Sequence, residues 1–294
     1  MPFRRPVTEL IQTRFSCRTY LNTPLEEAVR QQLVAFTAAA RTGPLGTPVR
    51  FQLVAATAED RTALKGLGTY GFICGATGFV LGAVQGGEKN MEDLGHWMER
   101  IILFATDLGL GTCWLGGTFS RSSFAAKMSL HEGELLVCVA AVGYISEKRR
   151  LMDRAIRRGA GSANRFPWEH MFFDTRFGTP LSPQTAGAYA VPLEMVCLGP
   201  SASNKQPWRI VKAGAAWHFY LQRTAGYGHR RAPGLQIADL QRVDMGIAMS
   251  HFELTAQEVR LAGHWVIQEP GIEKPDNSTE YIVSWMEGVA GSQQ

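Results

Sequence analysis

The sequence predicts an α+β protein built from two similar halves that pack face to face. Its 294 residues are 45% apolar and 19% charged, which is typical of a compact globular protein rather than a disordered, collagen-like or coiled-coil one. Helical and strand-like patterns follow one another along the chain, and three short motifs recur in the same order in its second half. We therefore expect a mixed or antiparallel sheet in each half, with long helices packed between the sheets.

Two segments of the first half carry clear helix signals. Thr23-Pro24-Leu25-Glu26 combines an N-cap, a proline at the first helical position and a capping-box glutamate, which predicts a helix from Pro24 to about Ala40. Apolar residues between Leu94 and Leu108 recur at i, i+3, i+4 spacing behind Asn90, which predicts a long core helix. The other patterns predict a helix at 58–67 and strands at 49–56, 71–84 and 135–142, the strand at 135–142 being central because its apolar run is continuous.

The second half echoes three motifs of the first. Thr13-Arg14-Phe15 recurs as Thr175-Arg176-Phe177, and Gly43-Pro44 ahead of 48–51 recurs as Gly199-Pro200 ahead of 207–210. The segment 110–114 has a weaker echo at 261–265, after a second long helix expected at about 237–261. Three echoes in one order predict a duplicated unit of about 150 residues. The expected halves are residues 1–165 and 166–294, packed as the subunits of a homodimer pack.

Charge and cysteine usage limit the possible classes of function. Residues 148–165 hold seven Lys or Arg against Asp153 alone, while the net charge of the chain is only +4, so we expect local recognition of an anion and no broad nucleic-acid face. The N-terminus lacks the apolar run of a signal peptide, and the uncharged stretch 67–87 is too rich in glycine for a membrane span, so we expect a cytoplasmic protein. Cysteines without CxxC or metal-ligand spacing predict reduced core thiols and no metal site (Cys17, Cys74, Cys113, Cys138 and Cys197).

Two polar motifs have the chemistry to recognise a small anionic ligand. Arg14, Ser16 and Arg18 occupy alternate positions, so in an extended segment all three point the same way and can grip a phosphate or an electron-rich ring edge. The ordinary alternative for such an isolated motif is a solvated charged loop. The segment 200–208 places hydroxyls, amides and a turn proline between an apolar stretch and an expected strand, where binding loops commonly lie. Ordinary turn chemistry is its alternative explanation.

Glycine and basic residues mark further candidate positions. Gly116 and Gly117 offer consecutive peptide N–H groups after a buried segment, which would let a flat heteroaromatic ligand touch the backbone, although a plain tight turn is also consistent. The GxGxxG match at 66–71 has the wrong context for a dinucleotide fold, because a helix is expected before it and a strand after it. Cations that follow Gly143-Tyr144 could close over a phosphate or simply form a solvated linker (Lys148, Arg149 and Arg150).

Taken together, these motifs resemble the flavin-dependent nitroreductase family. The resemblance rests on RxSxR at 14–18, GLGTCWLGG at 109–117, a Gly-Tyr followed by basic residues, and PSxxNxQPW at 200–208, and it covers roughly residues 10–285. It is strongest to the putative nitroreductase subgroup, in which two nitroreductase-like halves share one chain. The resemblance implies a nitroreductase-like fold forming an intrachain pseudo-dimer, an FMN cofactor, and hydride taken from NADH or NADPH.

The resemblance also implies roles for individual residues. Arg14 and Ser16 match the family's phosphate and ribityl contacts, and Arg18 matches the cation near flavin N1 and O2, the one residue given a catalytic role. Gly116 and Gly117 match the backbone that faces N5 and O4, although the family often has an acidic residue there. The other implied cofactor contacts are the distal phosphate cations Lys148, Arg149 and Arg150, and a loop that homodimers take from the partner subunit, here Pro200, Ser201, Ser203, Asn204 and Gln206.

The function implied is that of an NAD(P)H-dependent FMN oxidoreductase of the nitroreductase type, which reduces nitroaromatic, quinone or flavin-type acceptors. A non-catalytic flavin-binding protein for storage or sensing is the main alternative, because fold and cofactor do not fix activity. We expect a small-molecule electron acceptor as partner, no nucleic acid, no membrane, and a monomer or weak homodimer. We also expect one FMN per chain, because the second-half counterparts of the binding motifs lack the serine and the second arginine.

Overall fold

The computed structural model describes residues 2–147, 164–227 and 238–288, and we call residues 2–147 the first half and residues 164–288 the second half. The first half contains α1 (Val7–Thr13), α2 (Glu27–Ala39), β1 (Val49–Ala55), η1 (Thr62–Leu64), β2 (Gly78–Gln85), α3 (Asn90–Asp107), β3 (Gly111–Leu115), α4 (Arg121–Met128) and β4 (Glu134–Gly143). The second half contains η2 (Trp168–His170), β5 (Phe172–Asp174), α6 (Pro183–Ala186), η3 (Gly187–Tyr189), α7 (Ala190–Cys197), η4 (Ala202–Asn204), β6 (Trp208–Ala213), β7 (Ala216–Gln222), α8 (Leu240–Glu258), β8 (Gly263–Val266) and β9 (Thr279–Glu287).

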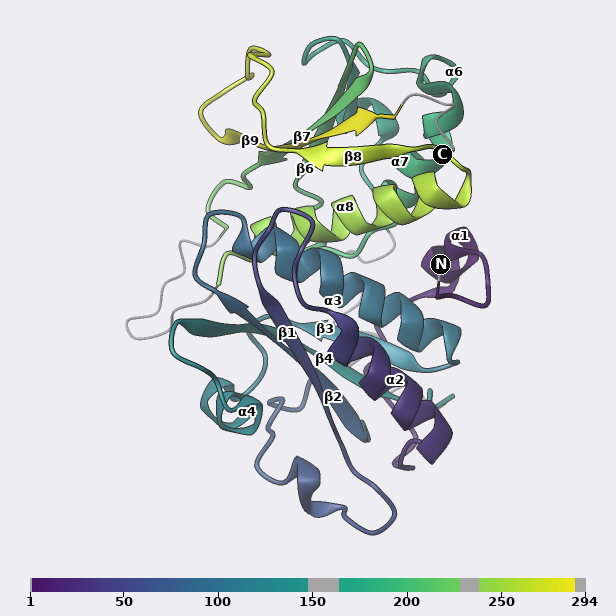
Figure 1. Cartoon of the computed structure of the whole chain (residues 1–294), viewed down its shortest axis with the longest axis vertical. Helices are drawn as coiled ribbons and strands as arrows, with labels where there is room; N and C mark the ends of the chain where they lie inside the picture. Colours follow the sequence, from purple (N-terminus) through teal and green to yellow (C-terminus); the bar gives the residue numbers. More distant parts are fainter. Residues whose placement is uncertain (1, 148–163, 228–237, 289–294) are drawn as a thin grey trace, which may run out of the picture.

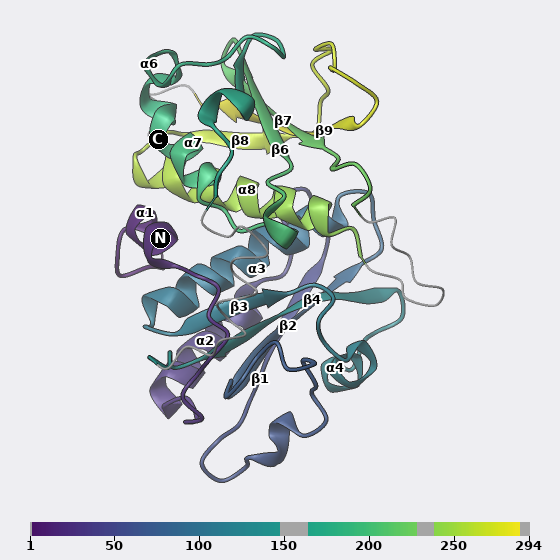
Figure 2. The same ribbon diagram turned by 180° about the vertical axis from the view of Figure 1, so that it is seen from behind.

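The two halves have sheets of the same design. The first sheet has the strand order β1-β2-β4-β3, and the second has β6-β7-β9-β8 with β5 added beyond β6. Neighbouring strands pair antiparallel, except that β5 runs parallel to β6. Helices α3 and α8 lie side by side between the sheets in both views (Figures 1 and 2). The fold is therefore α+β, with two pseudo-repeated halves that form an intrachain pseudo-dimer.

The crossing of α3 and α8 is a backbone-to-backbone contact. A Cβ atom added at Gly95 of α3 would overlap the carbonyl oxygen of Val243, and one added at Gly246 of α8 would overlap the carbonyl oxygen of Glu92. Glycine at both positions lets the helix backbones approach more closely than any side chain would allow. Arg242 of α8 adds a side-chain contact at the crossing, because its guanidinium forms an ion pair with the fully buried Glu92 carboxylate of α3 at 2.6 Å.

The strongest patterns in the sequence are confirmed. Helix α3 spans Asn90–Asp107 as expected, and its apolar face is buried in the first-half core. Strand β4 lies between β2 and β3, in the predicted central position. Helix α8 is shorter than expected and begins after Asp239, whose carboxylate accepts the backbone N–H of Arg242.

Three expectations about the first half are wrong in detail. Helix α2 begins at Glu27 rather than Pro24, because Leu25 is buried and the N–H of Glu26 donates to the hydroxyl of Tyr144, which keeps this approach extended. The helix expected at 58–67 is reduced to η1, because Asp60 accepts both the N–H and the hydroxyl of Thr62, local bonds that compete with a helix. The strand expected from residue 71 begins at Gly78, after a loop in which Gly71 and Gly75 have positive φ.

Two of the three sequence echoes correspond to equivalent places in the fold. The Gly-Pro echo leads into β1 and β6, and the echo at 110–114 and 261–265 leads into β3 and β8, which hold matching positions in their sheets. The Thr-Arg-Phe echo is wrong as an equivalence. The segment after α1 runs beside β3, where Ser16 bridges Thr112, whereas 175–177 follows β5 at the opposite edge of its sheet.

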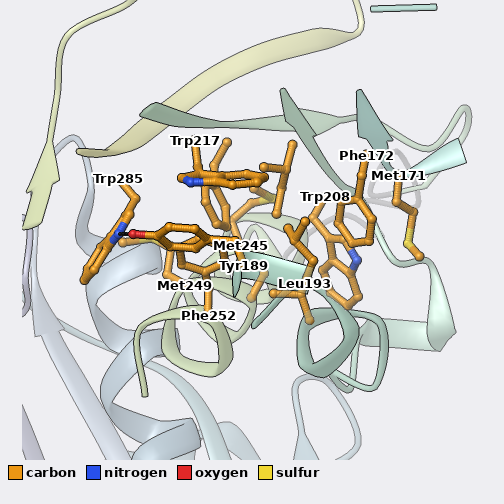
Figure 3. Packing of buried hydrophobic residues seen from close by; sticks show 14 of the residues in the cluster. Met171, Phe172, Tyr189, Leu193, Trp208, Trp217, Met245, Met249, Phe252 and Trp285 are labelled. Atoms are coloured by element: carbon orange, nitrogen blue, oxygen red, sulfur yellow. Dashed lines mark hydrogen bonds between the residues drawn. The ribbon is translucent and has the colours of Figure 1, made fainter. Parts of the chain in front are cut away.

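The second-half core is filled with aromatic side chains. Figure 3 shows Trp217, Trp285 and Tyr189 packed around Phe252, a residue of α8. Trp285 lies opposite Trp265 in the β8–β9 register, and the matching position opposite Trp114 in the β3–β4 register is Ala140. An indole in the second-half core therefore stands where the first-half core has a methyl group.

The cysteines and the glycine-rich stretch 67–87 differ in how far they match the expected positions. Cys17, Cys113 and Cys138 are buried as expected, whereas Cys74 is exposed, because it lies in a loop whose backbone pairs with Thr19. The stretch 67–87 forms a loop followed by β2. None of the helices in the described ranges has the length and apolar character needed to cross a bilayer.

Replacing Gly95 by alanine tests the helix crossing. We expect Gly95→Ala to lower the free energy of unfolding by about 2–3 kcal/mol, because the new methyl group overlaps the backbone of α8 and forces the halves apart. Urea unfolding followed by circular dichroism measures the change. Gly86→Ala is the control, because a Cβ there meets nothing within 4 Å; equal stability of the two variants would contradict the tight crossing.

Candidate functional site

A pocket of about 360 Å³ lies between the halves, a size suited to a small organic cofactor. The first half contributes the segment after α1, the end of β3 and Cys138 of β4, and the second half contributes the loop before β6 and one face of α8. The predicted site residues that line it are Arg14, Ser16, Arg18, Gly116, Gly117, Pro200, Ser201, Ser203 and Asn204. The structure thus brings together residues that lie nearly 200 positions apart in the sequence.

The arginine motif reaches the pocket because its backbone is extended. Helix α1 ends at Arg14, which has φ −61° and ψ 133°, and the N–H of Cys17 then donates to the carbonyl of Thr112 in β3 at 2.8 Å. Residues 14, 16 and 18 all line the pocket, and Phe15 between the first two lines it as well. The side chain of Arg14 is only 6% exposed, which excludes the solvated-loop alternative for this residue.

The two glycines after β3 form another part of the wall. Gly116 packs against Leu240 of α8 so closely that an added Cβ would lie 2.5 Å from the Leu240 side chain. Gly117 has open space beside it, with no atom within 4 Å of an added Cβ. The wall here is therefore backbone without side chains, which allows a flat ligand to approach peptide groups directly.

The loop that enters from the second half is strained. Ser203, Asn204 and Gln206 all have φ between +46° and +55°, a left-handed conformation that L-residues other than glycine seldom adopt. Strain of this kind persists only where the surroundings impose it, and it is concentrated at functional sites. The conformation is fixed by hydrogen bonds within the loop and to the segment 164–166.

Gln206 holds this loop in place and does not line the pocket. It is 2% exposed, its side-chain carbonyl accepts the N–H of Phe166, and its own N–H donates to the hydroxyl of Ser201. Its contribution to a site is therefore indirect. Lys148, Arg149 and Arg150 lie outside the described residues.

Asp244 of α8 holds the same loop, at residues 200–206, through a backbone hydrogen bond. Both of its carboxylate oxygens accept the N–H of Ala202, at 2.9 and 3.1 Å. Burial raises the pKa of Asp244 well above its ordinary value, although the Ala202 hydrogen bond acts in the opposite direction. Asp93 of α3 makes the equivalent contacts in the first half, accepting the N–H groups of Leu45 and Thr47. Asp244 thus belongs to a loop clamp present in both halves, but only Asp244 lines the pocket.

Arg165 adds a second, half-buried guanidinium, which the sequence analysis placed only at the half boundary and in the basic segment 148–165. It lines the pocket and donates to the side-chain oxygen of Asn204 at 2.8 Å. Burial, and then the nearby positive charge of Arg14, lower the pKa of Arg165. Two like charges close enough to act on each other in a pocket favour an anionic ligand. The sequence held a signal for this residue, since Arg165 ends the basic segment that predicted anion recognition.

Other lining residues had weaker signals or none in the sequence. Asp244 interrupts the apolar pattern of α8, which marks a buried carboxylate, but nothing in the sequence connects it with the pocket. The aromatic and apolar lining residues were assigned to the core or left unassigned (Phe15, Trp114, Cys138, Tyr227, Leu240, Val243 and Ile247).

Two similar α+β halves with an anion-favouring pocket between them define the class of protein as a nitroreductase-like pseudo-dimer. The family model described as "Putative TM nitroreductase" matches residues 6–256, and the chain belongs to this family. Among proteins with curated descriptions, none matches this sequence.

A solved structure similar over nearly the whole chain has the same fold. A nitroreductase from Thermotoga maritima, described as putative, shares 18% identity with a TM-score of 0.59, covering 97% of this chain and 95% of that chain. A nitroreductase from Bacteroides fragilis with bound FMN shares 20% identity with a TM-score of 0.39, covering 50% of this chain and 92% of that chain.

Asp244→Asn should become more stabilising as the pH rises. The pKa of Asp244 is higher in the folded than in the unfolded state, so folding with aspartate costs progressively more from about pH 4 up to the raised pKa. Asparagine keeps an acceptor for Ala202 without this cost. We expect a gain over wild type that grows by up to about 1.4 kcal/mol per pH unit, measured on the apoprotein by urea unfolding at pH 4, 6 and 8. A gain independent of pH would contradict the raised pKa.

Proposed function

We propose that this protein is an FMN-dependent oxidoreductase that takes hydride from NADH or NADPH and reduces nitroaromatic, quinone or flavin-type acceptors. The observation that carries the proposal is the pairing of Arg14 and Arg165 beside hydroxyl and amide groups in a pocket whose other walls are backbone and apolar side chains. A phosphate monoester matches the first set and a flat ring system matches the second. Family membership supports the same assignment.

The residues present fit FMN. The Nε atom of Arg14 is buried without a hydrogen-bond partner, and the nearest carboxylate oxygen, from Glu99, is 3.6 Å away. A phosphate dianion beside Arg14 and Arg165 would offset the cost of removing a buried and a half-buried cation from water. Arg14, Ser16, Arg165 and Asn204 would hold the phosphate and ribityl groups, and the loop clamped by Asp244 would close over them.

When bound, FMN supplies the hydride chemistry. The chain contributes position and charge. Arg18 is proposed to stabilise negative charge that develops on the reduced ring, an electrostatic role that requires no proton transfer by the side chain. The backbone at Gly116 and Gly117 is proposed to orient the ring, since both positions lack side chains that would block it.

Binding of FMN, followed by turnover, tests the proposal. We expect apoprotein to bind FMN at micromolar concentration or below, and Arg14→Ala to weaken binding by about 10- to 100-fold through loss of a charge-assisted contact. Quenching of flavin fluorescence measures both dissociation constants. Arg30→Ala is the control, because Arg30 forms only a surface ion pair with Glu27.

The outcomes separate the candidate functions. Oxidation of NADH or NADPH by the FMN-loaded protein in the presence of a nitro compound or quinone supports the enzyme. Tight FMN binding without turnover supports the flavin storage or sensing alternative. A wild-type protein that does not bind FMN contradicts both.

We further propose one FMN per chain and a duplicated ancestral half. The proposal is supported by Leu45, which stands at the position that matches Ser201 after the Gly-Pro echo and packs against the second-half core, where Ser201 lines the pocket. Flavin extraction from quantified, FMN-saturated protein measures the ratio, and a value near two per chain would show that both pockets are open.

A further inference from the structure

A buried polar cluster, formed by Glu99, His251, Trp114 and Arg14, lies against the wall of the pocket. The Glu99 side chain, on α3, is fully buried, and its Oε2 accepts the indole N–H of Trp114 at 2.8 Å. Its Oε1 lies 3.0 Å from Nε2 of His251 on α8 and 3.6 Å from Nε of Arg14. Trp114 and Arg14 both line the pocket, so one carboxylate contacts two pocket side chains from outside.

The hydrogen bonds of His251 fix where its protons lie. Its Nδ1 is 2.8 Å from the carbonyl oxygen of Met195 on α7, and a carbonyl can only accept, so Nδ1 carries a hydrogen. The 3.0 Å contact between Nε2 of His251 and Oε1 of Glu99 then contains one shared proton. His251 thereby joins α7 and α8 of the second half to Glu99 in the first half.

The other side of the helix pair holds a cluster of the same composition. Glu253 of α8 accepts the indole N–H of Trp265 at 3.0 Å and lies 2.7 Å from Nε2 of His96 and 3.5 Å from Arg100. Trp265 occupies the position in β8 that Trp114 occupies in β3. Residues of this second cluster do not line the pocket. The second cluster therefore packs between the halves as the first cluster does, but it does not contact the site.

We propose that Glu99 and His251 are positioning residues, which hold Trp114 and Arg14 in the arrangement that receives the cofactor. This inference rests on the proposed function, because FMN is the ligand whose binding it concerns. A side chain already held in its binding rotamer loses no further rotamer freedom when the ligand arrives. Without Glu99, the indole N–H of Trp114 would lose its partner, and Arg14 would have to find another orientation.

Paired alanine variants test the proposal on the full chain. We expect Glu99→Ala to raise the dissociation constant for FMN about tenfold or more, and Glu253→Ala to change it less than twofold, although each removes a carboxylate from the same helix pair. Flavin-fluorescence quenching measures both constants, and circular dichroism verifies folding.

Glu99→Gln separates positioning from general packing. A glutamine can accept from Trp114 through its carbonyl and donate to Nε2 of His251 through its amide, but that amide offers no acceptor to Arg14, so we expect a dissociation constant between those of wild type and Glu99→Ala. If Glu99→Ala does not fold, His251→Asn and His96→Asn replace the alanine pair, with a several-fold loss of affinity expected only for His251→Asn.

The possible failures are distinguishable. A wild-type protein that does not bind FMN overturns the proposed function and this inference together. Normal FMN binding by the wild type, with equal losses in the two paired variants or with no rescue by glutamine, overturns the inference alone.

Discussion

The close crossing of α3 and α8 is the constraint on which the pocket depends. Gly95 and Gly246 let the two helix backbones touch, and this contact sets how near α8 lies to the end of β3. Leu240 of α8 is then packed directly against Gly116 of the first half, and Asp244 of the same helix holds the second-half loop at 200–206. A side chain at either glycine would separate the two groups of residues that form the pocket walls.

The elements that were predicted correctly are those whose position is controlled by a local sequence pattern. The periodicity of α3 and the continuous apolar run of β4 were sufficient to place these two elements, because each pattern depends on neighbours within a few residues. The two echoes that lead into matching strands were also sufficient to identify equivalent places in the halves. The extended backbone around Arg14, Ser16 and Arg18 also brings all three to the pocket. Tertiary contacts decided the failures: burial of Leu25 delayed the start of α2, and β5 placed Thr175–Phe177 at an edge of the sheet that no local signal specifies.

The residues of the pocket that the sequence did not reveal depend on contacts between segments far apart in the chain. Arg165 and Asp244 meet the loop at 200–206 from other segments of the second half, and Glu99 of the first half reaches His251 across the interface. A charged residue within an apolar helix indicates that a buried partner exists, but not which one. That choice depends on the crossing geometry of α3 and α8, which the spacing of residues along one chain does not encode.

Because both halves lie on one polypeptide, the two sides of the interface between them can differ in sequence. Two identical subunits contribute the same residues to both sides of their interface, so any residue that fills one pocket also fills the equivalent pocket. In a single chain Leu45 can pack into the core on one side while Ser201 lines an open pocket on the other. The tether also keeps the effective concentration of one half around the other on the order of millimolar, whatever the amount of protein present. The pocket therefore has no dissociation equilibrium between subunits to overcome, even at extreme dilution.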